Sequence, residues 1–277
     1  MAVEVNFQSV EDIEFTASER AIFNVLKATL QYPANPQTKA TKLAADIEFF
    51  CNSAEGAAAI DELLWYLWAV IVEIAQQIPP GHPWQVSLIE SLDNLRQRDG
   101  SVLGSDKSTM LWKDLPNLSA CVREKWIDPT DSGEDPSDNF AKWVNLNSFI
   151  AGLTRKGFAP WLNLPIWQLR AALEEPIVKG PAMECRLQVA SEWLLHCAGP
   201  IFKDMKLDED EEVDESLARA LRTGPLCEGK APQSVERWNF WKKRLSELSG
   251  ELGSLEVDPG IKGRISDALK SMEVAEK

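Results

Sequence analysis

The stretch Ile60–Gln77, IDELLWYLWAVIVEIAQQ, decides the fold because it contains the most apolar run of the chain. Wrapped as a helix, it confines Asp61, Glu62 and Glu73 to one narrow side, and apolar side chains occupy nearly all the rest. The uninterrupted apolar run, Leu63–Val72, is too short to cross a bilayer. We therefore expect a buried helix at the centre of the fold and no membrane span.

Helical periodicity continues along the chain, with neither alternating strand patterns nor Asn-Gly hairpin turns. It predicts an all-α fold, an irregular bundle of about 9–11 helices around the central helix 57–77. We expect the helix 84–98 to turn Val86, Leu88, Ile89, Leu92 and Leu95 inward, and Ser53 to cap the central helix. The expected helices are 10–30, 36–51, 57–77, 84–98, 118–125, 140–156, 165–175, 182–206 with a break at Gly199–Pro200, 215–222, the stretch 234–248 and a tail from about 260.

Length and composition predict a single helical domain over residues 1–277, with two lobes as the alternative. The lobes would be residues 1–127 and 140–277, joined by the acidic loop 128–139. This loop lacks the ligand spacing of an EF-hand, so we interpret it as a solvated connector. The acid tract Asp208–Glu215 is expected to be mobile.

Charge and cysteine content restrict the partners and the compartment. Forty-three acids against 29 bases give a net charge of −14, which argues against nucleic acid as a partner. The N-terminus lacks the pattern of a secretory signal. Five cysteines without a CxxC pair are typical of a reduced intracellular protein, so we expect a cytoplasmic location.

Motifs for metal, nucleotide or cofactor chemistry are missing from the sequence, and we predict neither a metal site nor a cofactor. The two histidines, His82 and His196, are far apart in sequence. Cys197 adjoins His196, but neighbours on a helix point about 100° apart. We interpret Cys197 as a core cysteine beside an ordinary histidine.

The helix around Trp167 places two charged residues in an unusual position. Arg170 and Glu174 lie between its apolar stripe and Trp167, and they are spaced as an i,i+4 pair. One interpretation is a partly buried, structurally specific pair. The other is the polar floor of a pocket.

The stretch Ser234–Leu248, SVERWNFWKKRLSEL, has a packing face formed by Val235, Trp238, Trp241, Leu245 and Leu248. Lys242 falls inside this apolar face, Arg237 and Arg244 flank it, and Phe240 lies on the outer side. A buried unpaired ammonium is costly. Lys242 must therefore reach solvent, lie on an indole ring or meet a carboxylate from another helix.

Several tryptophan-centred blocks together resemble the fungal family of unknown function numbered 3632. The blocks are His82–Trp84, Leu92–Arg96, Leu111–Pro116, Arg123–Trp126, Asn145–Thr154, Ile166–Glu175, Gly224–Leu226 and Glu236–Leu245. The resemblance covers roughly residues 15 to 250 and implies a soluble, helical fungal protein, without assigning a reaction or a binding residue.

Two functional hypotheses follow. The first is a non-catalytic binding or interaction protein, whose partner is an apolar small molecule or a protein. The alternative is a cofactor-independent enzyme that acts on an apolar small molecule in fungal specialised metabolism, using a tryptophan-lined cavity. The candidate pocket or binding residues are Trp112, Asp114, Trp167, Arg170, Glu174, Arg237, Trp238, Trp241 and Lys242.

Overall fold

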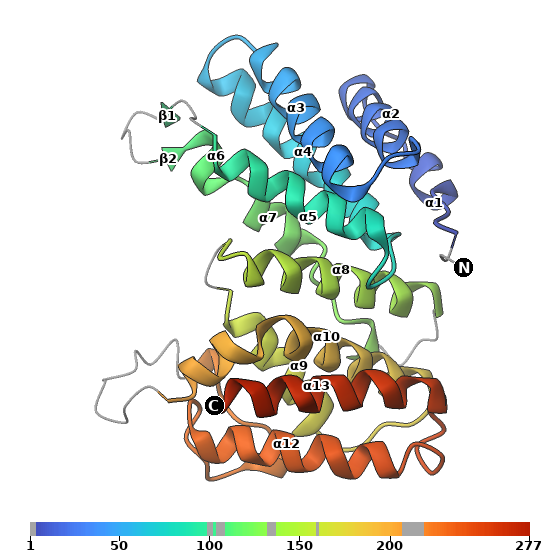
Figure 1. The fold of residues 1–277 in the computed structure, drawn as a ribbon, viewed down its shortest axis with the longest axis vertical. Coiled ribbons are helices and arrows are strands. Elements are labelled where there is room, and N and C mark those ends of the chain that lie inside the picture. The colour runs from blue at the N-terminus through green and yellow to red at the C-terminus, as the bar shows by residue number, and fades with distance from the viewer. Residues whose placement is uncertain (1–3, 99–101, 104–108, 132–136, 159–160, 207–218) are drawn as a thin grey trace. The chain divides into compact units, whose positions relative to one another are not determined.

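The computed structural model describes residues 4–98, 102–103, 109–131, 137–158, 161–206 and 219–277, and these are helical almost throughout (Figure 1). The exception among them is a two-residue antiparallel pairing of β1 (Val102–Leu103) with β2 (Thr109–Met110). The prediction of an all-α fold is confirmed.

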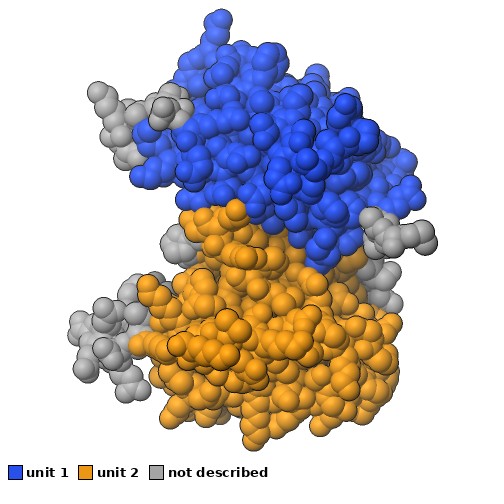
Figure 2. All heavy atoms as spheres, viewed as in Figure 1, with its two compact units in different colours: residues 1–128 blue, residues 129–277 orange. Residues whose placement is uncertain are grey.

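The chain divides into two compact units, residues 1–128 and residues 129–277 (Figure 2). Each unit buries an apolar core of its own, around Trp68 in the first and around Trp193 in the second. The predicted choice between one domain and two lobes stays a prediction.

The core of the first unit is formed by helices that pack around α4 and along α3. Helix α4 packs against α2, α3 and α7, and α3 packs along α5. The elements are α1 (Gln8–Glu11), α2 (Ala17–Gln31), α3 (Pro36–Asn52), α4 (Ala57–Gln76), α5 (Pro83–Arg96), β1, β2, α6 (Leu111–Asp114) and α7 (Leu118–Glu124).

The N-terminal helix expected over residues 10–30 is in fact two helices. Thr16 and Glu19 form a capping box at the start of α2: Thr16 Oγ1 accepts from the Glu19 N–H at 3.2 Å, and Glu19 Oε2 accepts from the Thr16 N–H at 2.8 Å. This box satisfies N–H groups that a continuous helix would bond internally. The chain therefore turns between α1 and α2.

The prediction that Ser53 caps the central helix is also wrong. Gly56 is the N-cap of α4, with φ of +86°, a conformation that favours glycine. Ser53 instead ends α3, where its hydroxyl donates to the Phe49 carbonyl at 2.8 Å.

The inward face of α5 differs from the expected one at Val86, which is 40% exposed. Leu88, Leu92 and Leu95 are buried as expected, and Ser91 is buried with them, donating its hydroxyl to the Leu88 carbonyl at 2.7 Å. Helix α3 packs along α5, so this packing rather than the hydrophobicity of Val86 decides which face of α5 is buried.

The second unit is organised around α10, which packs against α8, α9 and α13, while α12 packs against α9 and α13. Its elements are η1 (Pro129–Asp131), α8 (Ser137–Arg155), α9 (Asn163–Leu173), α10 (Pro181–Asp204), η2 (Pro225–Cys227), α12 (Val235–Gly250), η3 (Pro259–Ile261) and α13 (Lys262–Ala275).

Helix α10 breaks near the expected Gly199–Pro200, but the distorted residue is Cys197, with φ of −128° and ψ of 15°. A proline inside a helix lacks the N–H for the preceding turn, and its ring clashes with the carbonyl four residues earlier. The distortion therefore falls in the turn before Pro200.

The start of the acidic loop 128–139 is a helical turn held by a side chain of α10 rather than a plain connector. Its first residues form η1, and Arg186 donates from Nε to Thr130 Oγ1 at 2.9 Å and pairs with Asp131 at 3.2 Å. Residues 132–136 of this loop, the acid tract expected to be mobile and residues 215–218 of the expected helix 215–222 lie outside the described residues.

Helix α12 buries Trp238, Trp241, Leu245 and Leu248 as its sequence predicts. Val235, at the first turn, is 40% exposed, because the helix begins there and has fewer neighbours to cover it. Phe240, expected on the outer side, is half-buried.

Replacing Trp238 by alanine should lower the free energy of unfolding by about 3–5 kcal/mol, because the fully buried indole would leave a cavity. The ring packs against Phe202 and Trp241, with centroids 5.1 and 6.5 Å away. Urea unfolding measures the change. The exposed Val235→Ala on the same helix is the control and should change stability by less than about 0.5 kcal/mol. If the free energy of unfolding of Trp238→Ala equalled that of the wild type, the assignment of Trp238 to the core would be contradicted.

Candidate functional site

Glu174 is the residue around which the predicted site of the second unit gathers. It is the C-cap of α9, and its N–H donates to the Arg170 carbonyl at 2.8 Å. The side chain is fully buried, because it follows the buried stripe that contains Leu169 and Leu173. Helical packing therefore carries a carboxylate into the interior.

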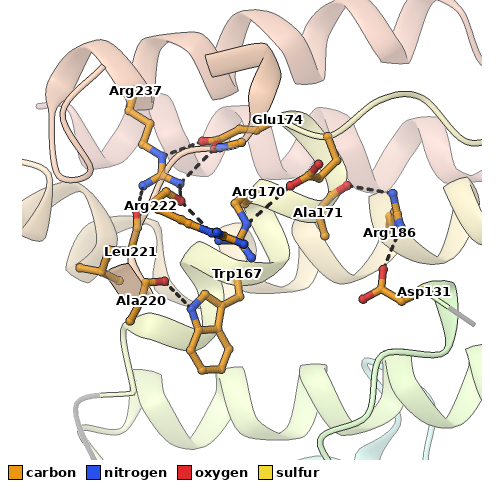
Figure 3. Close-up of polar contacts among 12 residues, drawn as sticks. Asp131, Trp167, Arg170, Ala171, Glu174, Arg186, Ala220, Leu221, Arg222 and Arg237 are labelled. Atoms are coloured by element: carbon orange, nitrogen blue, oxygen red, sulfur yellow. Dashed lines mark hydrogen bonds and ion pairs between the residues drawn. The ribbon is translucent and has the colours of Figure 1, made fainter. Parts of the chain in front are cut away.

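The Glu174 carboxylate accepts four hydrogen bonds, and Figure 3 shows those from Arg237. Oε1 accepts from Arg237 Nε at 2.6 Å and from Trp241 Nε1 at 2.5 Å. Oε2 accepts from the Gly224 N–H at 2.6 Å and from Arg237 Nη2 at 3.1 Å. These bonds fill the roughly four acceptor positions of a carboxylate. We call Glu174, Gly224, Arg237 and Trp241 the Glu174 cluster.

The Arg237 guanidinium is equally saturated. Besides its bonds to the carboxylate, Nη1 donates to the Leu221 and Pro232 carbonyls at 2.6 Å each, and Nη2 donates to the Arg222 carbonyl at 3.2 Å. All five N–H groups of the fork thus have acceptors. The guanidinium also lies over the Trp241 ring, 5.0 Å from its centroid.

Gly224 is required at its position by the close approach of Glu174. A Cβ at Gly224 would lie 2.8 Å from the Glu174 Cβ and 2.8 Å from its carbonyl oxygen, closer than real atoms pack. The Glu174 carbonyl then accepts from the Leu226 N–H at 2.9 Å. The segment before α12 is therefore tied to the end of α9 through both side chain and backbone.

The predicted i,i+4 pair of Arg170 with Glu174 is wrong. Arg170 instead pairs with Glu175 at 3.8 Å, and its Nη1 donates weakly to the Arg222 carbonyl at 3.4 Å. Glu174 turns inward because Arg237 offers it a bidentate partner in the interior.

Trp167 joins the same segment from a different point. Its ring is half-buried, and its indole N–H donates to the Ala220 carbonyl at 2.7 Å. Figure 3 shows the indole on the side of α9 that faces Ala220 and Leu221. Trp167 therefore anchors the start of the segment, and the Glu174 cluster holds its middle.

Trp238 and Lys242 point to a second carboxylate, Glu276 at the end of α13. Glu276 Oε1 accepts from Trp238 Nε1 at 2.8 Å, and Oε2 accepts from Lys242 Nζ at 2.7 Å. Burial works to raise the pKa of Glu276, but these two hydrogen bonds and the Lys242 charge outweigh it and lower the pKa. An acidic partner from another helix, one of the three alternatives for Lys242, is confirmed.

Trp112 and Asp114 belong to the first unit. Trp112 is buried, whereas Asp114 is exposed and accepts from the Met110 N–H at 2.6 Å. Asp114 thus caps the short helix α6 instead of bonding an indole. The other seven candidate residues all lie in the second unit.

Sequence reasoning missed a further buried carboxylate, Glu192 of α10. It accepts from Ser148 Oγ of α8 at 2.7 Å and pairs with Arg264 of α13. The available signal was the glutamate within the otherwise apolar run Val189–Leu195, a position at which a charge needs a partner.

Cys197 is a core cysteine as its sequence interpretation expects, whereas His196 differs from an ordinary histidine in its pKa. Burial raises the pKa of the Cys197 thiol to about 12, and the thiol donates to the Ala151 carbonyl at 3.4 Å. Burial, with the charges of Arg155 and Arg264, lowers the pKa of His196 to about 4. A protonated thiol beside a neutral imidazole is not an activated nucleophile.

Among the hollows of the described residues, two on the first unit have a volume of about 370 Å³ each. One lies between α2, α4 and the turn that follows α3, with Ile22, Phe50 and Leu63 among its apolar lining and Glu62 and Tyr66 at its wall. The other is a polar hollow formed by residues 4–8 with parts of α1 and α2. None of the nine candidate residues lines either hollow.

Within the described ranges, no set of three or more histidine, cysteine, aspartate or glutamate side chains is placed to hold a metal ion. No helix in the part of the chain that the structure describes is long and apolar enough to span a membrane.

The fold and its buried ion pairs define an all-α protein of two helical units, with helices cross-linked by carboxylates in the second. The family model described as a protein of unknown function (DUF3632) matches residues 68–245, more than half of the chain, and the chain belongs to that family. The resemblance inferred from the tryptophan-centred blocks is confirmed. No curated protein and no solved structure matches the chain.

Replacing Glu174 by glutamine should lower the free energy of unfolding by about 3–5 kcal/mol, because it leaves the Arg237 charge buried without a counter-charge. Urea unfolding measures the loss. Glu175→Gln removes the same charge from the neighbouring, partly exposed side chain and should cost less than about 1 kcal/mol. Equal stability of the two variants would contradict a structural role for the Glu174 cluster.

His196 should make the protein less stable as the pH falls from about 6.5 to about 4. The unfolded chain takes up a proton near pH 6.5, whereas folded His196 resists protonation down to about pH 4. Across that window His196→Gln should lose less stability than the wild type, by about 2 kcal/mol. Parallel pH dependence of urea unfolding for the two proteins would contradict this role.

Proposed function

We propose that the chain is a non-catalytic binding protein whose second unit is a scaffold and whose first unit presents the binding surface. The observation that carries this proposal is the saturation of the Glu174 cluster. Its carboxylate already accepts from donors within the chain and its guanidinium already donates to acceptors there, so neither is left to orient or protonate a substrate.

The enzyme hypothesis has less support. It requires tryptophans around a cavity and polar groups that face into it. Trp238 and Trp241 are instead fully buried, and the indole N–H of each is bonded to a glutamate. Lys242 is paired with Glu276, and Asp114 caps a helix.

The positive support for binding comes from the first unit. The hollow beside α4 has the size of a small-molecule site and combines apolar side chains with a carboxylate and a hydroxyl. We therefore propose that the partner is a small molecule with an apolar body.

We further propose a cytoplasmic location. The five cysteines all lie within the described residues, and each is a buried free thiol. Free thiols fit a reducing compartment, since oxidising compartments favour paired cysteines.

Native mass spectrometry of the protein from its own organism tests the binding function. We expect a fraction of the protein to carry a retained small molecule above the 31.0 kDa mass of the chain, and the molecule to be lost on unfolding in urea. Fresh protein incubated with the purified molecule should return it unchanged. Conversion to a product would contradict a non-catalytic role, and a bare chain without any retained molecule would contradict the binding proposal.

A further inference from the structure

The hollow beside α4, which we call the Glu62 hollow, is defined by Ile22 of α2, Phe50 of α3, and Glu62, Leu63 and Tyr66 of α4. Ile22 is buried, Phe50, Leu63 and Tyr66 are half-buried, and Glu62 is exposed. The volume of about 370 Å³ falls at the lower end of the range for ligand sites. The hollow can hold a compact organic molecule with one polar end.

Charge in the Glu62 hollow has one sign. Glu62 is the ionisable carboxylate among its lining residues, and no lysine, arginine or histidine lines it. The Tyr66 hydroxyl donates to Glu62 Oε1 at 2.8 Å, which turns both groups toward the same point. Among the hydrogen bonds of the described residues, the Glu62 side chain accepts this one, and it accepts it through Oε1. The other carboxylate oxygen, Oε2, therefore remains available as an acceptor.

The surroundings of the Glu62 hollow reinforce the negative potential. The hydrogen bond to Glu62, the Glu62 charge, burial and the Glu19 charge together raise the pKa of Tyr66. Arg20, a cation on the same helix as Ile22, is held elsewhere: it donates to the Ile13 carbonyl at 2.6 Å and lies over the Phe15 ring, 4.9 Å from its centroid.

Aromatic rings complete the site. Phe50 and Tyr66 line the hollow, and Phe49, next to Phe50, leaves its ring 69% exposed at the surface. Aromatic faces attract organic cations, and a neighbouring carboxylate adds to that attraction. An anion would meet Glu62 without a compensating positive charge in the lining.

We propose that the Glu62 hollow binds an organic monocation, an amine or quaternary ammonium with an aromatic or aliphatic body, whose charged end lies between Glu62 and Tyr66. This inference rests on the proposed binding function and names its ligand class. The lining residues precede residue 68, so the site lies outside the segment that the family model matches.

Titration with three probes of matched size tests the ligand class: 2-phenylethylammonium, neutral 2-phenylethanol and anionic 3-phenylpropionate. The readout is the methyl NMR signals of Ala21, Ala54 and Ala59, which line the hollow. We expect the ammonium probe to shift these signals saturably, with an affinity up to about fivefold above that of the alcohol, the upper value of one exposed ion pair. The affinity for the carboxylate probe should be lower than the affinity for the alcohol.

Two charge-removing variants supply the matched comparison. Glu62→Gln should reduce the affinity for 2-phenylethylammonium to about that for the alcohol, because it removes the charge that distinguishes the two probes. Glu55→Gln removes a charge from an exposed residue of the nearby turn that does not line the hollow, and should change the affinity less than about twofold.

Each contrary result has a distinct meaning. Equal affinity for the alcohol and the ammonium, or equal losses in the two variants, would overturn the cation class while leaving an apolar binding site in place. No shift by any probe up to about 10 mM would overturn the Glu62 hollow as a site, since weaker contacts are non-specific. The binding function would then be decided by the retained molecule in native mass spectrometry.

Discussion

The Arg237 guanidinium and the Glu174 carboxylate are both fully buried, and the second unit is built around the need to satisfy them. Two charges removed from water cost several kcal/mol each, which their mutual attraction offsets only when every remaining donor and acceptor is bonded. Here the bonds come from the end of α9, the segment before α12 and α12 itself. Packing of these three parts is therefore interdependent, because displacement of one leaves a charge without partners.

Carboxylates bond to side chains of other helices at two further places in the second unit. Glu192 joins α10 to α8 through Ser148 and to α13 through Arg264, and Glu276 at the end of α13 joins it to α12 through Trp238 and Lys242. Carboxylates in this unit act as cross-links between helices. The first unit also joins helices in this way, through the pairs Glu11–Lys27 and Glu73–Lys125, but its Glu62 carboxylate lies at an open hollow.

Local patterns predicted much of the fold, and their failures have identifiable causes. The helices over residues 36–51 and 57–77 begin and end within a residue or two of their predicted limits, because apolar periodicity and the prolines beside them are local signals. The single helix 10–30 failed because the Thr16 capping box outweighs continued periodicity. Val86 was assigned inward from its hydrophobicity, whereas the approach of α3 decides which face of α5 is covered.

The sequence by itself determined the helical class, the burial of Trp238 and Trp241, and the need of Lys242 for a partner, since each depends on residues of one helix. Only the tertiary structure decided that Glu174 pairs with Arg237, 63 positions away, rather than with Arg170 on its own helix. The physical reason is that a helical wheel describes neighbours three and four residues apart, whereas a buried carboxylate takes the donors that helix packing brings to it. The Glu62 hollow likewise exists only once α2, α3 and α4 are assembled.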